Sequence, residues 1–276
     1  MRTRLFADRK NTHLRVKLSQ IQIKDETLTG LSRLVLALSL LTITGCTQVG
    51  RAPHWQDVSI VGSGNIVSQT RPLSGFTRVD AGLVFDLTIQ QGEEYSVVLV
   101  ADDNWVDYLS ADVEGTTLVL DYVDGYAYNV SGVTTRVEIT MPELEGLSLS
   151  SSAHARLDDV QAAELLVVEM TGSTSLNGTL TADVLNLGFN GGSFVDLAGS
   201  SHTINLDICG SSLVNLSELE ADQAKIELAC SDITIVQVHE RLAVEAAQNA
   251  QLYYVGAPKE RMINVHESAS VLPYTE

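Results

Sequence analysis

The sequence predicts an all-β fold of the parallel β-helix (β-solenoid) class, and three observations support this class. A pattern with a spacing of 18 to 21 residues recurs from Leu147 to Val271. Within each unit, apolar and polar residues alternate, which is typical of β-strands. The turns between the alternating segments are too short for a regular antiparallel return. Equivalent strands of successive units are therefore expected to stack in parallel.

Each repeat unit contains two pairs of inward apolar or small residues, separated by a turn of small or polar residues. The first pairs are Leu147/Leu149, Val168/Met170, Leu187/Phe189, Leu206/Ile208, Ile226/Leu228, Val244/Ala246 and Ile263/Val265. The second pairs are Ala153/Ala155, Thr174/Leu176, Ser193/Val195, Ser212/Val214, Ala250/Leu252 and Ala269/Val271. One unit is irregular, because strict alignment would bury Asp232. We therefore expect Ile233 and Ile235 to point inward there, with one extra residue in the turn.

Other repeat architectures fit less well. Leucine-rich repeats need a helix and a leucine consensus, and β-propellers need four strands over about 40 residues. A generic β-sandwich with accidental periodicity is the remaining alternative, and seven matching units argue against it.

The segment before the repeat is rich in strands but less regular. Alternating or apolar runs occupy residues 83–90, 95–100, 116–122 and 133–141, and residues 102–109 suit a short helical turn. Tyr122, Tyr126 and Tyr128 surround an Asp-Gly turn and predict an aromatic group on a hairpin. Such a group suits glycan or protein contacts, but cross-strand packing explains it as well. No linker divides the chain, so residues 61–276 are expected to form one domain.

The N-terminus has the features of a bacterial lipoprotein signal. Eight Lys or Arg residues within positions 1–33 precede an apolar run at 34–44, which is too short to span a membrane. The following Ile43-Thr44-Gly45-Cys46 resembles a lipobox, whose Cys becomes the lipid-bearing first residue. We therefore expect a signal peptide at 1–45, and the lipidated Cys46 with a tether at 46–60. The alternatives are an ordinary signal peptide with a chance Cys, and translation that starts nearer Leu28 or Leu31.

The charge of the chain restricts its partners. The formal net charge is −18, and residues after position 45 carry nine basic and 32 acidic residues, a net charge of −23. Such a body repels phosphate backbones and anionic headgroups, so nucleic-acid binding is not expected and membrane attachment must depend on lipid. Thr47, rather than Asp, follows Cys46, which favours the outer membrane if the organism is Gram-negative.

Two further cysteines fall in adjacent predicted turns. Cys209 is in phase with the outward Asp207, whereas Cys230 is in phase with the inward Ile226 and Leu228. Diverging side chains argue against a disulfide, although an extracytoplasmic location favours one. The sequence leaves the bridge undecided.

Four segments carry a family resemblance. Gly62-Ser63-Gly64-Asn65-Ile66-Val67, Leu73-Ser74-Gly75-Phe76-Thr77-Arg78-Val79, Leu87-Thr88-Ile89-Gln90-Gln91-Gly92 and Val100-Ala101-Asp102-Asp103-Asn104 resemble the head GIN domain family of auto-transporter adhesin heads. The resemblance covers about residues 61–274. It implies a right-handed parallel β-helix, a cell-envelope location and no established activity. The family's repeated Gly-Ser-Gly turns are retained here only as Gly172, Gly191/Gly192 and Gly210.

Motifs for catalysis, metals and cofactors are absent from the sequence. His54, His154, His202, His239 and His266 are isolated, with no zinc or nucleophile spacing. The pairs Asp102/Asp103 and Asp158/Asp159 suit turn caps better than calcium sites. We therefore predict no catalytic residue, cofactor or metal. A carbohydrate-active enzyme with acidic side chains in a groove is the alternative function.

Surface recognition is the function that the outward residues favour. The outward positions of the second strand are predicted to be His154, Ser175, Phe194, Leu213, Thr234, Gln251 and Ser270. Phe194 and Leu213 would then be exposed neighbours, which is typical of an interaction patch. Coverage by a loop or by the N-terminal part is the alternative. The sequence thus predicts an adhesin-like protein that binds a protein or glycan, with an oligomeric state left open.

Overall fold

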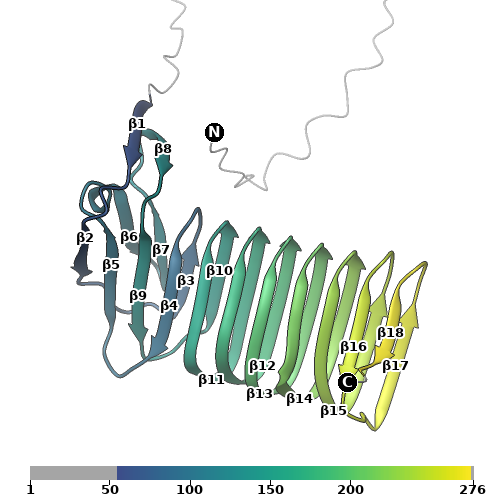
Figure 1. The fold of residues 1–276 in the computed structure, drawn as a ribbon. Helices are drawn as coiled ribbons and strands as arrows, with labels where there is room; N and C mark the ends of the chain where they lie inside the picture. The colour runs from purple at the N-terminus through teal and green to yellow at the C-terminus, as the bar shows by residue number, and fades with distance from the viewer. Residues whose placement is uncertain (1–54, 275–276) are drawn as a thin grey trace, which may run out of the picture. The chain divides into compact units, whose positions relative to one another are not determined.

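In the computed structural model, which describes residues 55–274, the chain forms a stack of parallel strands (Figure 1). The predicted β-helix with turns of about 20 residues is confirmed. The predictions for the signal peptide, Cys46 and most of the tether lie outside the described residues. Within the described range, no helix is long and apolar enough to cross a membrane.

Five long, bent strands make up the regular part of the stack. They are β11 (His154–Gly172), β12 (Ser175–Gly191), β13 (Phe194–Gly210), β14 (Leu213–Cys230) and β15 (Ile233–Ala246). Each pairs in parallel with the next, and equivalent residues of successive turns are register partners, such as Leu187 with Leu206 and Leu206 with Ile226. We call the surface formed by β10 and the C-terminal halves of these strands the first face. The second face contains their N-terminal halves.

The stack continues into the less regular N-terminal part. Before β11 come β10 (Gly146–Ser151) and β4 (Asp86–Gln91), and β3 (Arg78–Ala81) pairs in parallel with β10. A further layer consists of β7 (Thr117–Tyr122) against β3 and β9 (Thr135–Met141) against β4. The layer made by β7 and β9 therefore precedes β3 and β4 in the stack, although it follows them in the sequence.

Antiparallel strands close this end of the stack. β6 (Leu109–Glu114) pairs with β7, β5 (Ser96–Asp102) pairs with β9, and β2 (Ile66–Arg71) pairs with β5. β1 (Gln56–Val61) and β8 (Tyr126–Ser131) form a separate two-stranded sheet. The expected helical turn is the short 3-10 helix η1 (Val106–Tyr108). Antiparallel pairing here uses the backbone groups that a parallel edge would leave open.

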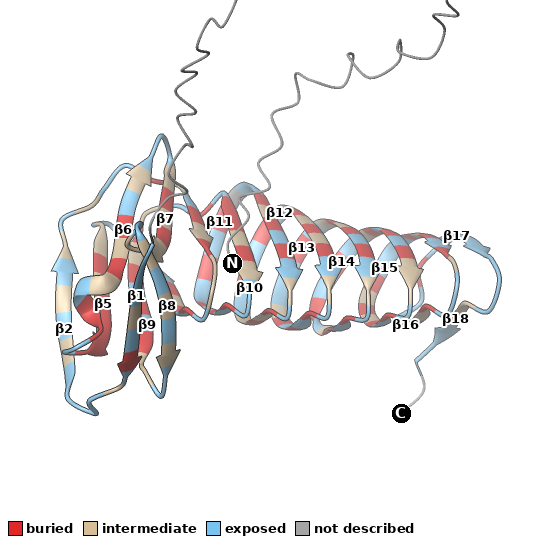
Figure 2. Cartoon of the chain, turned by 90° about the horizontal axis from the view of Figure 1, so that it is seen from above, coloured by how far each residue is buried: buried red, intermediate tan, exposed pale blue. Residues whose placement is uncertain are grey.

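The C-terminal end has no such closure within the described residues. It consists of β16 (Gln251–Val255), β17 (Glu260–Val265) and β18 (Ser270–Pro273), and every residue of β17 is exposed (Figure 2). Ile263 and Val265 were predicted as core residues and are 37% and 43% exposed. The prediction was wrong because no further turn lies against β17, although Ile263 is the register partner of the buried Val244.

The core lies between the two faces of the stack. Leu187, Phe189, Leu206 and Ile208 are at most 3% exposed. Their alternation with exposed or half-buried residues follows from the strand repeat of two. The burial pattern in Figure 2 shows this alternation along the bent strands.

The turn around Asp232 keeps the regular spacing, and the first register shift between β14 and β15 comes later, between Leu216 and Glu220. Leu213 pairs with Ile233 and Val214 with Thr234, so Thr234 points inward with 0% exposure and Ile233 outward. Asp232 is also fully buried. The prediction that Ile233 and Ile235 would point inward, and Thr234 outward, was wrong because the strict register is kept and the carboxylate is buried instead.

The expected divergence of the two cysteines is also wrong. The Sγ atoms of Cys209 and Cys230 lie 3.3 Å apart, and neither side chain is in the core. Cys230 has a φ of 100°, in the left-handed region. This conformation breaks the alternation that in-phase counting from Leu228 assumes, so the thiol turns toward Cys209.

The tyrosines do not lie on a hairpin, because β7 and β8 belong to different sheets. Tyr122 and Tyr128 pack around the fully buried Trp105, with ring centroids 4.8 and 5.5 Å from it, and Tyr126 packs against Tyr128 at 5.7 Å. Burial raises the pKa of Tyr128 to about 12, and its hydroxyl donates to the carbonyl of Val123 at 2.6 Å. Packing in the N-terminal part therefore accounts for this aromatic group.

Candidate functional site

Three apolar side chains form an exposed row on the second face. Phe194, Leu213 and Ile233 are 46%, 44% and 40% exposed. They are successive register partners across β13, β14 and β15. Neighbouring strands in a sheet are about 4.8 Å apart, so the three side chains are close neighbours on a rigid support. We call these three residues the apolar row.

The strand repeat explains why the apolar row points outward. Val195, Val214 and Thr234 follow its members in sequence and are fully buried, so the residue before each must face away from the core. The predicted positions of Phe194 and Leu213 therefore agree with the structure, and no described segment covers them. Their role in binding stays a prediction.

Ile233 is the member of this row that the sequence analysis missed. Counting 20 residues from Leu213 identifies it directly. The expectation that Asp232 would not be buried moved the predicted inward positions by one residue, which placed Ile233 in the core. Beyond Ile233, the half-buried Ile235 and Tyr253 are register partners on the same face. Leu272, which pairs with Tyr253, is 49% exposed. The apolar surface thus extends toward the C-terminal end of the stack.

Polar side chains lie beside the apolar row. Asn177, Asp196 and Asn215 are register partners two residues further along β12, β13 and β14. The Asn215 side-chain amide donates to Asp196 Oδ1 at 2.9 Å. An apolar surface next to fixed amide and carboxylate groups can contact the apolar side of a ligand and hydrogen-bond its polar groups.

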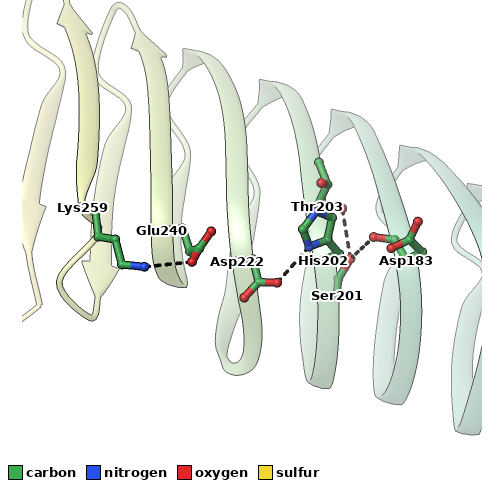
Figure 3. Close-up of polar contacts among 7 residues, drawn as sticks. All are labelled: Asp183, Ser201, His202, Thr203, Asp222, Glu240 and Lys259. Carbon is green, nitrogen blue, oxygen red and sulfur yellow. Dashed lines mark hydrogen bonds and ion pairs between the residues drawn. The ribbon is translucent and has the colours of Figure 1, made fainter.

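A second row of polar residues lies near the bend that follows the second face (Figure 3). His202 Nδ1 lies 2.8 Å from Asp222 Oδ2, and Lys259 Nζ lies 2.9 Å from Glu240 Oε1. The hydrogen bond to Asp222 raises the pKa of His202, and that to Glu240 raises the pKa of Lys259. All four side chains are about half exposed or more, so these pairs are surface ion pairs of small energetic weight.

The proximity of Ser201, His202 and Asp222 does not amount to a catalytic triad. Ser201 is 5% exposed, and its hydroxyl donates to the backbone carbonyls of Asp183 and Thr203 at 3.3 and 3.0 Å (Figure 3). Successive strand residues point to opposite sides, so Ser201 faces inward while His202 faces solvent. A nucleophile must contact its base, and this serine does not.

A shallow hollow lies on the first face, where Gly188 has no side chain. Its volume is about 320 Å³, and its lining includes Glu169, Asp207 and Glu227. Asn186 and Asn205 also line it, and the Asn205 amide donates to Asn186 Oδ1 at 2.8 Å. In this hollow, carboxylates from several turns of the stack line one surface.

The described residues contain no group of three or more His, Cys, Asp or Glu side chains that could hold a metal ion. Asp102 and Asp103 have structural partners instead. Asp102 is 1% exposed and accepts the amides of Gly64 and Thr134, both at 2.7 Å. The Thr134 amide, followed by the Gly64 amide, lowers the pKa of Asp102. These hydrogen bonds join two loops to the end of β5 at the closed end of the stack.

Comparisons with known proteins agree with this architecture. A family described as "Putative auto-transporter adhesin, head GIN domain" matches residues 75–258. No curated protein matches the chain significantly.

Several solved bacterial structures have a similar fold. A "putative adhesin" from Bacteroides fragilis is 19% identical, with a TM-score of 0.67, covering 78% of this chain and 100% of that one. A "putative lipid binding protein" from Parabacteroides distasonis is 16% identical, with a TM-score of 0.60, covering 79% and 100%. A "putative adhesin" from Parabacteroides merdae is 14% identical, with a TM-score of 0.58, covering 79% and 99%. At these identities the similarity shows the fold.

Proposed function

We propose, for a chain that belongs to the head GIN domain family of auto-transporter adhesins, a role as a non-catalytic cell-envelope lipoprotein that recognises protein or glycan. Residues 1–45 would be the signal peptide, residues 46–60 the lipidated Cys46 and its tether, and residues 61–276 the displayed domain. The apolar row is the single observation that carries the recognition role. Three exposed apolar side chains on adjacent turns of a rigid sheet have no covering segment among residues 55–274.

The physical support for recognition is that the row is preorganised. Its members are held by stacked strands, so the protein loses little conformational freedom when a ligand binds. Complete burial of a fully exposed side chain of this kind contributes about 1.5–3 kcal/mol, and covering the 40–46% of these residues that is still exposed contributes about half of that or less. The neighbouring Asp196 and Asn215 add directional hydrogen-bonding groups that favour one ligand orientation.

A glycan and cell-wall array, run together with a panel of envelope proteins, tests this role. We expect the Phe194→Ser/Leu213→Ser double variant to bind at least tenfold more weakly than the unmodified protein, because it lacks two apolar contacts. The matched control is Val84→Ser/Met262→Ser, which removes two exposed apolar side chains elsewhere. Equal binding by the unmodified protein and the Phe194→Ser/Leu213→Ser variant would show that the apolar row does not contact the ligand.

Lipid attachment through Cys46 is tested separately. Mass spectrometry of the mature protein should find an acylated N-terminal Cys46, and Cys46→Ala should move the protein out of the membrane fraction. An unlipidated chain with a different first residue would contradict this proposal. Thr47 after Cys46 leads us to expect the outer membrane in a Gram-negative organism.

The hollow around Gly188 is the observation that favours the alternative, a carbohydrate-active enzyme. Paired carboxylates are the chemistry of glycoside hydrolysis, and Glu169, Asp207 and Glu227 line this hollow. Incubation with a polysaccharide panel separates the two functions. Turnover that is lost in Asp207→Asn would favour the enzyme, whereas binding without turnover supports recognition.

A further inference from the structure

Cys209 and Cys230 lie at the corner between the first and second faces, on adjacent turns. Cys209 pairs in register with Ala229 and Gly210 pairs with Cys230, so the two cysteines are diagonal neighbours. Their Sγ atoms are 3.3 Å apart. Cys209 is exposed and Cys230 is half-buried, so both thiols are outside the core and within reach of solvent.

The backbone geometry of such a diagonal pair suits a disulfide. Strands about 4.8 Å apart and a rise of about 3.3 Å per residue place the two Cα atoms about 6 Å apart. Disulfides most often join Cα atoms at that separation, and their sulfurs are about 2.05 Å apart. The sulfurs must approach by about 1.3 Å, which small rotations of the two side chains supply without movement of the strands.

The conformation of Cys230 is a second, independent observation. Its register partners in the three preceding corners are Gly210, Gly191 and Gly172. A Cβ added at those glycines would lie 2.0, 2.5 and 2.7 Å from a backbone oxygen of the preceding turn. Cys230 nevertheless adopts a φ of 100° at this corner, a conformation that non-glycine residues rarely adopt. The unfavourable conformation is what directs its thiol toward Cys209.

The pair does not have the composition of a metal site. A structural zinc ion takes four ligands, and no group of three candidate ligands exists among the described residues. Two adjacent thiols without further ligands are suited to oxidation instead.

We propose that Cys209 and Cys230 are oxidised to a disulfide that joins consecutive turns of the β-helix. The oxidant is a disulfide of a protein or small molecule. A thiolate of one cysteine attacks it, one donor sulfur leaves as a thiolate, and a mixed disulfide forms. The second cysteine thiolate then attacks its partner's sulfur and displaces the other donor sulfur. The two cysteines lose two protons and two electrons, and the donor disulfide becomes two thiols.

The bridge would fasten the turns that carry two members of the apolar row. Leu213 follows Cys209 by four residues, and Ile233 follows Cys230 by three. The proposal does not depend on the recognition function, since it rests on the thiols, the corner geometry and the proposed export of the chain to an oxidising compartment. A disulfide that closes a loop of this length is expected to raise the melting temperature by about 5–10 °C.

The test uses the full chain exported by its own signal and trapped with an alkylating reagent before lysis. Trypsin without reductant should release peptides 157–225 and 226–241 as one linked species, two hydrogens lighter than their sum. Reduction should separate them and lower the melting temperature. Cys209→Ser is the matched control and should melt at one temperature with or without reductant.

Two outcomes would overturn the proposal. One is recovery of both thiols in alkylated form, even after incubation with oxidised glutathione. The other is a linkage between two chains or to Cys46, which lies in the separate N-terminal peptide that ends at Arg51. Either result would mean that the corner does not form the bridge.

Discussion

Asp232 lies one turn beyond Ser212 in the interior of the stack, and its Oδ1 accepts the Ser212 backbone amide at 3.0 Å. The other carboxylate oxygen, Oδ2, has no hydrogen-bond partner, and neither has the hydroxyl of Thr234. The preceding inward positions are occupied by Ser212, Ser193 and Thr174, which hydrogen-bond to one another or to backbone groups. Asp232 is thus a charged group at the end of a row of small hydroxyl side chains.

Replacing Asp232 by Ser should stabilise the protein at neutral pH. Burial raises the pKa of Asp232. The folded state therefore holds this proton more tightly than the unfolded state, and stability falls as pH rises from about 4 through the folded pKa. Serine removes the unpaired oxygen and still offers an acceptor to Ser212, so we expect a gain of about 1–2 kcal/mol. Urea denaturation between pH 4 and pH 8 measures this, and Asp207→Ser is the control for net charge.

The inward assignment of Leu206 is tested against a neighbour of opposite orientation. Leu206 is 2% exposed and Leu213 is 44% exposed. Leu206→Asp would bury an unpaired charge and should cost at least about 3 kcal/mol or prevent folding. Leu213→Asp should change stability by less than about 0.5 kcal/mol. Equal melting temperatures for the two variants would show that the assignment of the faces is wrong.

Alternation predicted the strands of the regular stack well, because a slip of one residue reverses every side chain. The prediction at Asp232 was wrong because it kept one carboxylate out of the core and disregarded the alternation of the strand that follows. Placing Asp232 outside would also expose Val236 and Val238, which are fully buried, and bring Gln237 inward. Burying the Asp232 carboxylate costs less free energy than exposing these two valines and burying the glutamine. For the same reason, Ile233 was assigned to the core and was left out of the predicted exposed patch.

Other features depend on information that alternation does not contain. An alternating run predicts a strand but not its partner, so the placement of β7 and β9 before β3 and β4 could not be foreseen. The alternation predicted the wrong direction for the Cys230 side chain because the left-handed φ of this residue turns the side chain away from the inward side. The openness of the C-terminal end, which exposes Ile263, depends on the absence of a further turn among the described residues.

Asp102→Asn should lower the melting temperature by several degrees at neutral pH. The carboxylate accepts two backbone amides, from Gly64 and Thr134, and an amide side chain offers only one oxygen. The lowered pKa of Asp102 means that its stabilisation is present above pH 3.8 and is lost as pH falls through the folded pKa. The difference between variant and parent should therefore shrink below about pH 4.

The adjacent Asp103 provides the control for this variant. It is exposed and accepts the Ser63 hydroxyl at 2.6 Å and the Asn65 side-chain amide at 2.8 Å. Asp103→Asn should lower the melting temperature less, because no buried amide loses its partner. A larger loss for Asp103→Asn than for Asp102→Asn would contradict the role assigned to the buried carboxylate.

His202 should titrate at a higher pH than an ordinary histidine, and Asp222→Asn should bring its pKa back toward 6.5. The hydrogen bond that His202 donates to Asp222 is the main cause of the raised pKa, with a smaller charge effect from Asp183. Its stabilisation is fully present below pH 6.5 and is lost as pH rises through the folded pKa. NMR titration of the imidazole measures both values. Asp183→Asn is the control and should lower the pKa less than Asp222→Asn does.

Under reducing conditions, Cys230→Gly should be more stable than Cys230→Ala. Both variants remove the thiol and any bridge to Cys209, so they differ in the cost of the left-handed backbone at this corner. Glycine adopts a φ of 100° without the Cβ clash that alanine would have, which favours Cys230→Gly by about 1 kcal/mol. The register partner at the preceding corner is already Gly210. Urea denaturation of the two variants measures the difference, and a more stable Cys230→Ala would show that this corner does not require the left-handed conformation.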